Sequence, residues 1–144
     1  MPLLKIQQHM TYPQTASKTI HVTLWAAQIL VALFLITGAA LKFQPIEKIT
    51  PMMPWTGQVP AAVVRWLGVI DLLGALGLIL PSLLRMKPLL AVWAAIGVVV
   101  LMICATVFHV SRGEASVIGM NIFCAFIAIF IAWGRLKKAP ITAK

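Results

Sequence analysis

Six polar residues of this chain have the types and the positions to do chemistry inside a membrane. Asp71 is a carboxylate within a long apolar stretch. His109 ends another such stretch, and histidine is the usual proton carrier near neutral pH. Together with nearby donors and a second carboxylate, they could hold the polar head of a membrane-soluble ligand or pass a proton. The six candidates are Lys42, Arg65, Asp71, His109, Glu114 and Asn121.

Four apolar stretches carry or flank these residues, at 20–41, 62–80, 89–110 and 117–133. Each has about 17–22 residues, the length that an α-helix needs to cross about 30 Å of hydrocarbon. Only Arg65 and Asp71 are charged within them, and a carboxylate at the middle of a membrane costs at least ~2.5 kcal/mol. The short later connections favour antiparallel neighbours. We therefore predict an all-α, antiparallel four-helix transmembrane bundle over residues 20–134, with a cytoplasmic tail at 1–19 and a basic cytoplasmic tail at 135–144.

The composition excludes a soluble helical bundle. Hydrophobic residues make up 61% of the chain and charged residues 10%, whereas soluble proteins have roughly 45–50% and 25%. The net charge of +9 comes from basic residues that flank the apolar stretches, and they form no stripe interleaved with aromatics. We therefore expect a lipid bilayer around the protein and no nucleic-acid partner.

The basic residues also predict the orientation of the bundle. With four spans, both termini and the connection 81–88 lie on the same side of the membrane. This side has eight Lys and Arg residues, and the other side has about four. The positive-inside rule then places both termini in the cytoplasm. The first apolar stretch is longer than the core of a cleaved signal peptide and begins later, so we expect the protein to retain it.

Each apolar stretch has a face of small and polar residues at the three- and four-residue spacing that lines up on a helix. Transmembrane helices associate through such faces, so we expect them to point inward. The faces are Gln28, Ala32, Leu35, Ala39 and Lys42 in the first stretch, Val64, Gly68, Asp71, Ala75 and Leu78 in the second, and Asn121, Ala125, Ala128, Ala132 and Arg135 in the fourth. The third stretch has two candidate faces, one with Ala91, Ala95, Met102, Thr106 and His109, the other with Ala94, Gly97, Leu101, Cys104 and Phe108.

This arrangement brings the six candidates together in the outer half of the bundle, away from the termini. Arg65 lies ~9 Å from Asp71 along the helix but about 240° around it, so the two do not share a face. Asp71 has two open interpretations. It could lock the helices together through a hydrogen bond or an ion pair with Lys42 or Arg65, or it could bind a ligand or a proton. His109 is either an interfacial histidine or a proton carrier beside Asp71.

Several other residues have simpler interpretations. Pro81 is predicted to stop the second helix, and Pro88 to occupy the first position of the third. The segment 44–55 is either an ordinary interfacial loop or a cap over the mouth of the bundle. His9 and His21 lie at the other end, where we expect them to take no part.

The sequence gives little indication of a metal site or of a redox-active cysteine pair. The histidine and carboxylates have no ligand spacing of the HExxH kind, so no metal site is predicted. Cys104 and Cys124 share a depth on adjacent helices and could form a redox couple. Packing is the preferred interpretation, since the chain has no CxxC motif and free cysteine is commonly buried.

Motifs along the chain occur in a characteristic order. Gly38-Ala-Ala-Leu-Lys42-Phe43 closes the first stretch, Arg65-x-x-Gly68-x-x-Asp71 lies in the second, Phe108-His109-x-x-Arg112-Gly113-Glu114 follows the third, and Asn121 opens the fourth. This order resembles that of the DoxX-like membrane proteins over about residues 20–135. The resemblance implies a four-helix, multi-pass protein of the bacterial inner membrane. Family members often have Glu where this chain has Asp71, so the reach of this shorter acid towards Lys42 or His109 is left open.

The resemblance implies two functions of different classes. The family takes its name from a subunit associated with a thiosulfate:quinone oxidoreductase, and distant animal relatives act as receptor assembly chaperones. The first expectation is a quinone- or lipid-associated subunit of a membrane redox complex; no cofactor motif is evident, and quinone is the cofactor class considered. The alternative is a non-catalytic assembly or stabilising factor for another membrane protein, with homo-oligomers also considered. Neither function makes the chain an enzyme on its own, and a transporter is least favoured because the chain has no inverted repeat.

Overall fold

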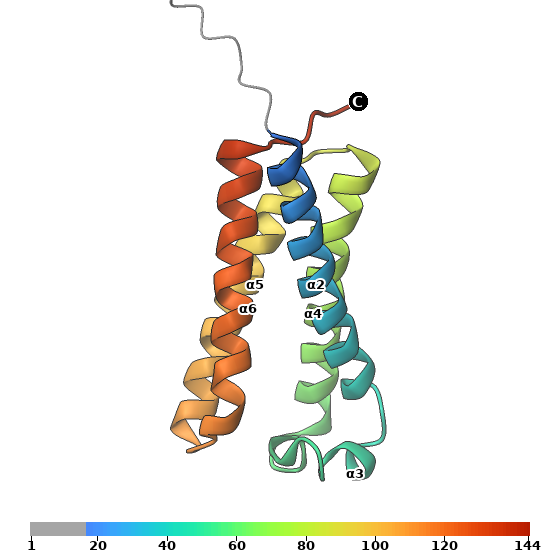
Figure 1. Ribbon diagram of the computed structural model, residues 1–144. Coiled ribbons are helices and arrows are strands. Elements are labelled where there is room, and N and C mark those ends of the chain that lie inside the picture. Colours follow the sequence, from blue (N-terminus) through green and yellow to red (C-terminus); the bar gives the residue numbers. More distant parts are fainter. Residues whose placement is uncertain (1–16) are drawn as a thin grey trace, which may run out of the picture.

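The computed structural model describes residues 17–144 and consists mainly of four long helices (Figure 1). These are α2 (Lys18–Lys42), α4 (Ala61–Leu84), α5 (Leu89–Ser111) and α6 (Ala115–Trp133), and α6 continues into the π-helical turn η3 (Gly134–Lys138). Two short helices, α3 (Ile46–Ile49) and η2 (Pro54–Gly57), connect α2 to α4. Each long helix is long and apolar enough to cross a membrane. The predicted all-α four-helix bundle is confirmed, whereas most of the predicted N-terminal tail, with His9, lies outside the described residues.

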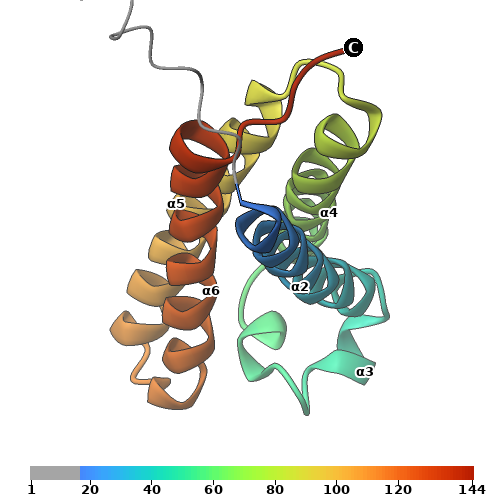
Figure 2. The same ribbon diagram turned by 45° about the horizontal axis from the view of Figure 1, so that its top comes forward.

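The long helices form two pairs. α2 lies beside α4, and α5 lies beside α6, in both views of the molecule (Figures 1 and 2). Contacts of α4 with α5 and of α2 with α6 complete the bundle. The start of α2, the α4–α5 connection and the end of α6 lie at one end, which we call the terminal end. The opposite end, with α3, η2 and the α5–α6 connection, is called the cap end.

The small-residue faces predict the buried sides of α2 and α4 well, whereas on α6 the buried side includes Cys124 and Ile131, and the predicted Ala125 and Ala132 are only half-buried. All five residues of the predicted face of α4 are buried, and Ala91, Ala95 and Met102 select the first of the two candidate faces of α5. On the second face, Cys104 is exposed and Gly97 has open space around it. Large apolar side chains such as Trp66 and Phe126 point outward and are about two-thirds exposed, at 68% and 67%. Such an apolar exterior suits a lipid environment, because lipid tails take the place of water around it.

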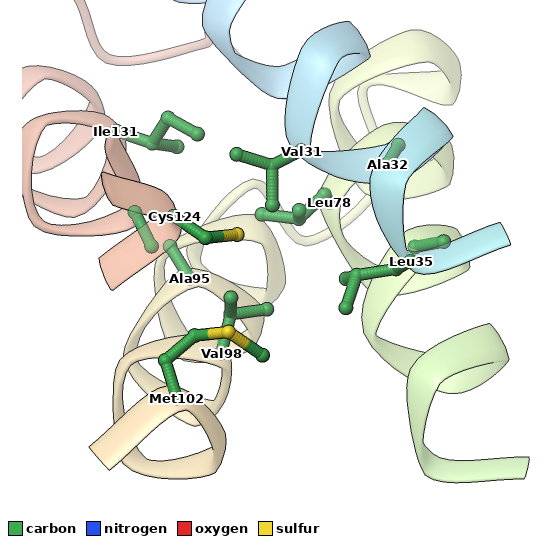
Figure 3. Close-up of a cluster of buried hydrophobic side chains, with 11 residues drawn as sticks. Val31, Ala32, Leu35, Leu78, Ala95, Val98, Met102, Cys124 and Ile131 are labelled. Atoms are coloured by element: carbon green, nitrogen blue, oxygen red, sulfur yellow. The ribbon is translucent and has the colours of Figure 1, made fainter. Parts of the chain in front are cut away.

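The core lies in the middle of the bundle and contains residues from all four helices (Figure 3). Leu35, Leu78, Val98 and Ile131 are almost completely buried there, each with at most 2% of its surface exposed. Cys124 belongs to the same cluster. The helices therefore meet through aliphatic and small side chains, and polar groups lie above and below this layer.

The segment between α2 and α4 forms a cap rather than an extended loop. Ile49, Trp55 and Thr56 are buried, and the first two pack with Val64 of α4 and Phe108 of α5 in a second apolar cluster. The Trp55 and Phe108 rings meet edge to face, with centroids 5.9 Å apart. The cap interpretation of residues 44–55 thus agrees with their packing.

The predicted role of Pro81 is wrong, because α4 continues through this residue to Leu84. Proline removes a backbone donor but need not end a membrane helix when neighbouring groups satisfy the freed carbonyls. Pro81 leaves the Gly77 carbonyl without its helical donor, and the Gln28 side chain of α2 donates to the neighbouring carbonyl of Leu78. The helix ends instead at Leu84, where the C-cap residue Arg85 has a left-handed φ of 54°. Pro88 precedes α5 as its cap, one position earlier than predicted.

Candidate functional site

An ion pair between α2 and α4 is the central feature of the cap-end half. Lys42 Nζ lies 2.6 Å from Asp71 Oδ2, and the two side chains are only 13% and 8% exposed. Two glycines allow this approach. A Cβ on Gly38 would lie 3.2 Å from Asp71 Oδ2, and one on Gly68 would lie 3.1 Å from Lys42 Cβ. The shorter acid therefore reaches Lys42, and the pair joins the two helices in the manner of the helix-locking interpretation.

Arg65 does not pair with Asp71, as its position around the helix predicts. Its Nη1 donates instead to the backbone carbonyls of Lys42 and Gln44, the latter at 2.7 Å. These carbonyls belong to the end of α2, where backbone acceptors have no partner within the helix. A cation is also favoured there by the helix dipole. Arg65 thus caps α2 and fixes the backbone that carries Lys42.

Glu114 forms a second ion pair, with Arg112, and a hydrogen bond with His109 at the α5–α6 connection. His109 Nδ1 lies 2.6 Å from Glu114 Oε2, and Arg112 Nε donates to the other carboxylate oxygen at 3.1 Å. The hydrogen bond to His109, followed by that to Arg112, holds the pKa of the Glu114 carboxyl below its ordinary value. Arg112 also donates to the Gln58 side chain, and Trp55 packs edge to face on His109. These contacts tie the cap to the second helix pair.

Asn121 differs from the other candidates because its amide has no partner among the described residues. It lies on the inward face of α6 and is 9% exposed, and its Nδ2 atom is buried without an acceptor. Cys124, one turn away on the same face, belongs to the core. Asn121 therefore lies one turn beyond the core towards the cap end, just as Asp71 lies one turn beyond Ala75 on α4.

The six candidates gather in the cap-end half but as separate groups. Lys42, Asp71 and Arg65 belong to the α2–α4 pair, whereas His109 and Glu114 belong to the α5–α6 connection. No hydrogen bond between described residues joins the first ion pair to the second or to Asn121. The sequence pattern predicts the depth of these residues, but the divergence of the two helix pairs separates them.

A further polar network lies at the terminal end and was not predicted as a site. Gln28 and Arg135 are fully or almost fully buried, with 0% and 3% exposed. Arg135 Nε donates to Gln28 Oε1 at 2.7 Å, and Gln28 Nε2 donates to Ser82 Oγ at 3.0 Å. His21 Nδ1 lies 3.2 Å from Arg135 Nη1, so the histidine expected to take no part belongs to this network. The sequence does contain an indication of this network, since Gln28 and Arg135 lie at the same end of the predicted inward faces of the first and fourth stretches.

Two apolar grooves open on the outside of the bundle, and neither contains the polar candidates. One, of about 230 Å³, runs between α5 and α6 beside Met102 and Phe126. The other, of about 430 Å³, runs between α2 and α6 beside Leu30 and Phe130. Both cysteines are free, with Cys124 in the core and Cys104 exposed on α5. The bundle therefore separates buried polar groups from lipid-facing apolar surface.

These features define a small integral membrane protein, a four-helix bundle whose ends are joined by buried polar contacts. Residues 26–131 match the model of the DoxX-like family. The chain therefore belongs to the DoxX-like family, as the order of its motifs predicts. No significant match to a curated protein or to a solved structure was found.

Proposed function

We propose that this protein is a quinone- or lipid-associated subunit of a membrane redox complex and binds a ligand between its helix pairs. The observation that carries the proposal is the Asn121 amide, a buried donor without an acceptor among the described residues. An unsatisfied buried donor of this kind costs about 1–3 kcal/mol, so a structure retains it where a ligand can use it. A quinone carbonyl is an acceptor of the required kind on a molecule that is soluble in the membrane.

The cap-end half supplies further groups that suit such a ligand. The Lys42–Asp71 pair lies in the cap-end half of the other helix pair, and His109 lies in the last turn of α5. A bound quinone would supply electron and proton transfer to a partner protein. The chain's own residues would hold its polar head and, at His109, exchange protons with the cap-end surface.

The proposal includes a place and an orientation in the cell. We propose a bacterial inner membrane with both termini in the cytoplasm. The support is the charge distribution of the described residues: seven Lys and Arg lie at the terminal end, whereas all three acidic side chains of the chain lie in the cap-end half. A reporter fused after Lys144 should be active in the cytoplasm, and a periplasmic signal would contradict this orientation.

The quinone test compares two nearly isosteric variants. Asn121→Leu removes the unpartnered amide, while Thr106→Val removes a hydroxyl that already donates to the Met102 carbonyl. The protein is extracted gently with its lipids, and bound small molecules are identified by mass spectrometry alongside a redox difference spectrum. We expect a stoichiometric quinone in the wild type and in Thr106→Val, and a loss of at least about tenfold in Asn121→Leu. Phospholipid alone with a flat difference spectrum would contradict the redox role.

One observation favours the alternative, a non-catalytic assembly or stabilising factor. The groove between α5 and α6 is apolar, and its volume of about 230 Å³ suits side chains of another transmembrane helix. A photo-crosslinker at Phe126, 67% exposed beside this groove, would report the neighbours in native membranes. Crosslinks to a second membrane protein would support the alternative. Crosslinks only to further copies would instead indicate a homo-oligomer.

A further inference from the structure

Arg135 is a buried cation with an unused hydrogen-bond donor. Its Nε and Nη1 atoms contact Gln28, His21 and the carbonyl of Ala139, and its guanidinium lies 5.4 Å from the centre of the Trp25 ring. Its Nη2 atom is buried and has no partner among the described residues. The charge is therefore surrounded by neutral groups, and one donor lacks an acceptor.

The chain has no acidic side chain that could neutralise Arg135. It contains three acidic residues, Glu47, Asp71 and Glu114. Asp71 and Glu114 are engaged in ion pairs in the cap-end half, and Glu47 belongs to the short helix α3 at the cap end. No acidic side chain therefore balances the buried charge at the terminal end, and because an uncompensated buried charge is costly, an anion bound there would be stabilising.

Other cations lie at the same end of the bundle and raise its attraction for an anion. Arg85 and Lys87 lie in the α4–α5 connection, and Lys137 and Lys138 follow Arg135 in η3. Arg135 itself lies twenty residues after Ala115, the first residue of α6. This corresponds to about 30 Å along the helix, the thickness of the hydrocarbon layer, so Arg135 lies at the depth of lipid phosphates when Ala115 lies at the opposite surface.

An apolar groove opens on the outside of the bundle in its terminal-end half. It lies between α2 and α6, has a volume of about 430 Å³, and extends from Thr23 and Phe130 to Leu30 and Phe123. Phe130 precedes Arg135 by five residues, about 7.5 Å along the helix. The same two helices thus supply the Arg135–Gln28 contact and the walls of the groove.

We propose that Arg135 and the α2–α6 groove form a binding site for an anionic phospholipid at the terminal end. The phosphate pairs with the guanidinium through its free Nη2 donor, and an acyl chain occupies the groove. Phosphate and guanidinium match in charge and in hydrogen-bonding geometry. The apolar groove next to the cation favours a lipid over a free phosphate or the carboxylate of a partner protein. This site lies at the opposite end from the proposed quinone site and is independent of it.

The test is native mass spectrometry of the purified protein, titrated with phosphatidylglycerol and, separately, with phosphatidylcholine. Arg135→Gln removes the buried charge, and Lys138→Gln removes an exposed charge from the same turn. We expect Arg135→Gln to weaken phosphatidylglycerol binding at least about 30-fold. Lys138→Gln should weaken it no more than about fivefold. Phosphatidylcholine should bind more weakly than phosphatidylglycerol in the wild type and respond less to Arg135→Gln.

A second variant keeps the proposal testable if Arg135→Gln does not fold. Ala26→Phe fills the groove from its exposed side without touching Arg135. This variant should also lower phosphatidylglycerol binding and leave the unfolding midpoint of the protein unchanged. Wild-type affinity in both variants would overturn the proposal. Displacement of the lipid by inorganic phosphate alone would assign the site to a free anion, and an Arg135-dependent protein partner without bound lipid would assign it to a carboxylate.

Discussion

The Lys42–Asp71 ion pair offers the sharpest test of the cap-end geometry, because its partners occupy different positions in their helices. Asp71 lies within α4, whereas Lys42 is the last residue of α2 and its Cβ lies beside Gly68, one turn along α4 from Asp71. Charges 2.6 Å apart attract by about 6 kcal/mol at an effective dielectric constant of about 20. Desolvation of both groups opposes this attraction, and removing one partner of a buried pair costs about 3–5 kcal/mol.

We predict that Lys42→Met and Asp71→Leu lower the free energy of unfolding by different amounts. Lys42→Met leaves the Asp71 carboxylate without a counter-ion inside the membrane, so its cost should approach the upper value of about 5 kcal/mol. Asp71→Leu leaves the Lys42 ammonium, which can extend along its flexible chain to the lipid headgroups, and should cost about 3 kcal/mol. The double variant removes both charges and should cost about 1 kcal/mol or less.

The free energy of unfolding can be measured in mixed detergent micelles by raising the fraction of sodium dodecyl sulfate and following tryptophan fluorescence. Lys48→Met is the control, since it removes an exposed lysine of α3 and should change the stability by less than about 0.5 kcal/mol. Additive effects of Lys42→Met and Asp71→Leu in the double variant would show that the two charges do not interact. A larger cost for Asp71→Leu than for Lys42→Met would refute the argument that the unpaired lysine can reach the lipid headgroups.

Two further predictions concern the connections between helices. The pKa of Glu114 lies below its ordinary value of 4.5, so the stabilisation from its contact with His109 is present above that pH and is lost as the pH falls through the lowered pKa. The difference in unfolding midpoint between wild type and Glu114→Gln should therefore vanish in acid, and a constant difference would contradict this. Gly77→Ala would place a Cβ 2.8 Å from the Cβ of Ala94 and should destabilise the protein by about 1–3 kcal/mol. Gly97→Ala meets open space and should be neutral or stabilising by up to about 1 kcal/mol, and equal effects of the two substitutions would refute the close approach of α4 and α5.

The buried faces were predictable because small residues in an apolar helix mark the sides that approach other helices. On α4 the spacing from Val64 to Leu78 identifies the buried face residue by residue. On α5 it does not, since small residues occur on two faces and both satisfy the same spacing. Only the position of the neighbouring helices decides that Ala95 is buried and Gly97 is not.

The terminal-end network was harder to predict, since it depends on contacts between distant parts of the chain. Gln28 and Arg135 are separated by 107 residues, and their meeting requires α6 to continue into η3. The prediction that Pro81 ends α4 fails for a related reason. Its effect on α4 depends on whether another helix supplies a donor for the freed carbonyls, and here Gln28 donates to the nearby Leu78 carbonyl. A contact of this kind cannot be predicted from the residues next to Pro81, because it comes from another helix.

The contacts that join the two helix pairs differ between the two ends of the bundle. At the terminal end, Gln28 of α2 bonds to both α4 and η3, so one buried side chain ties the two helix pairs together. At the cap end, the pairs diverge, and their polar and aromatic links run through the cap, by Gln58 to Arg112 and by Trp55 to His109. The contacts between the two helix pairs at the cap end therefore depend on one short segment, whereas those at the terminal end depend on a buried side chain within the bundle.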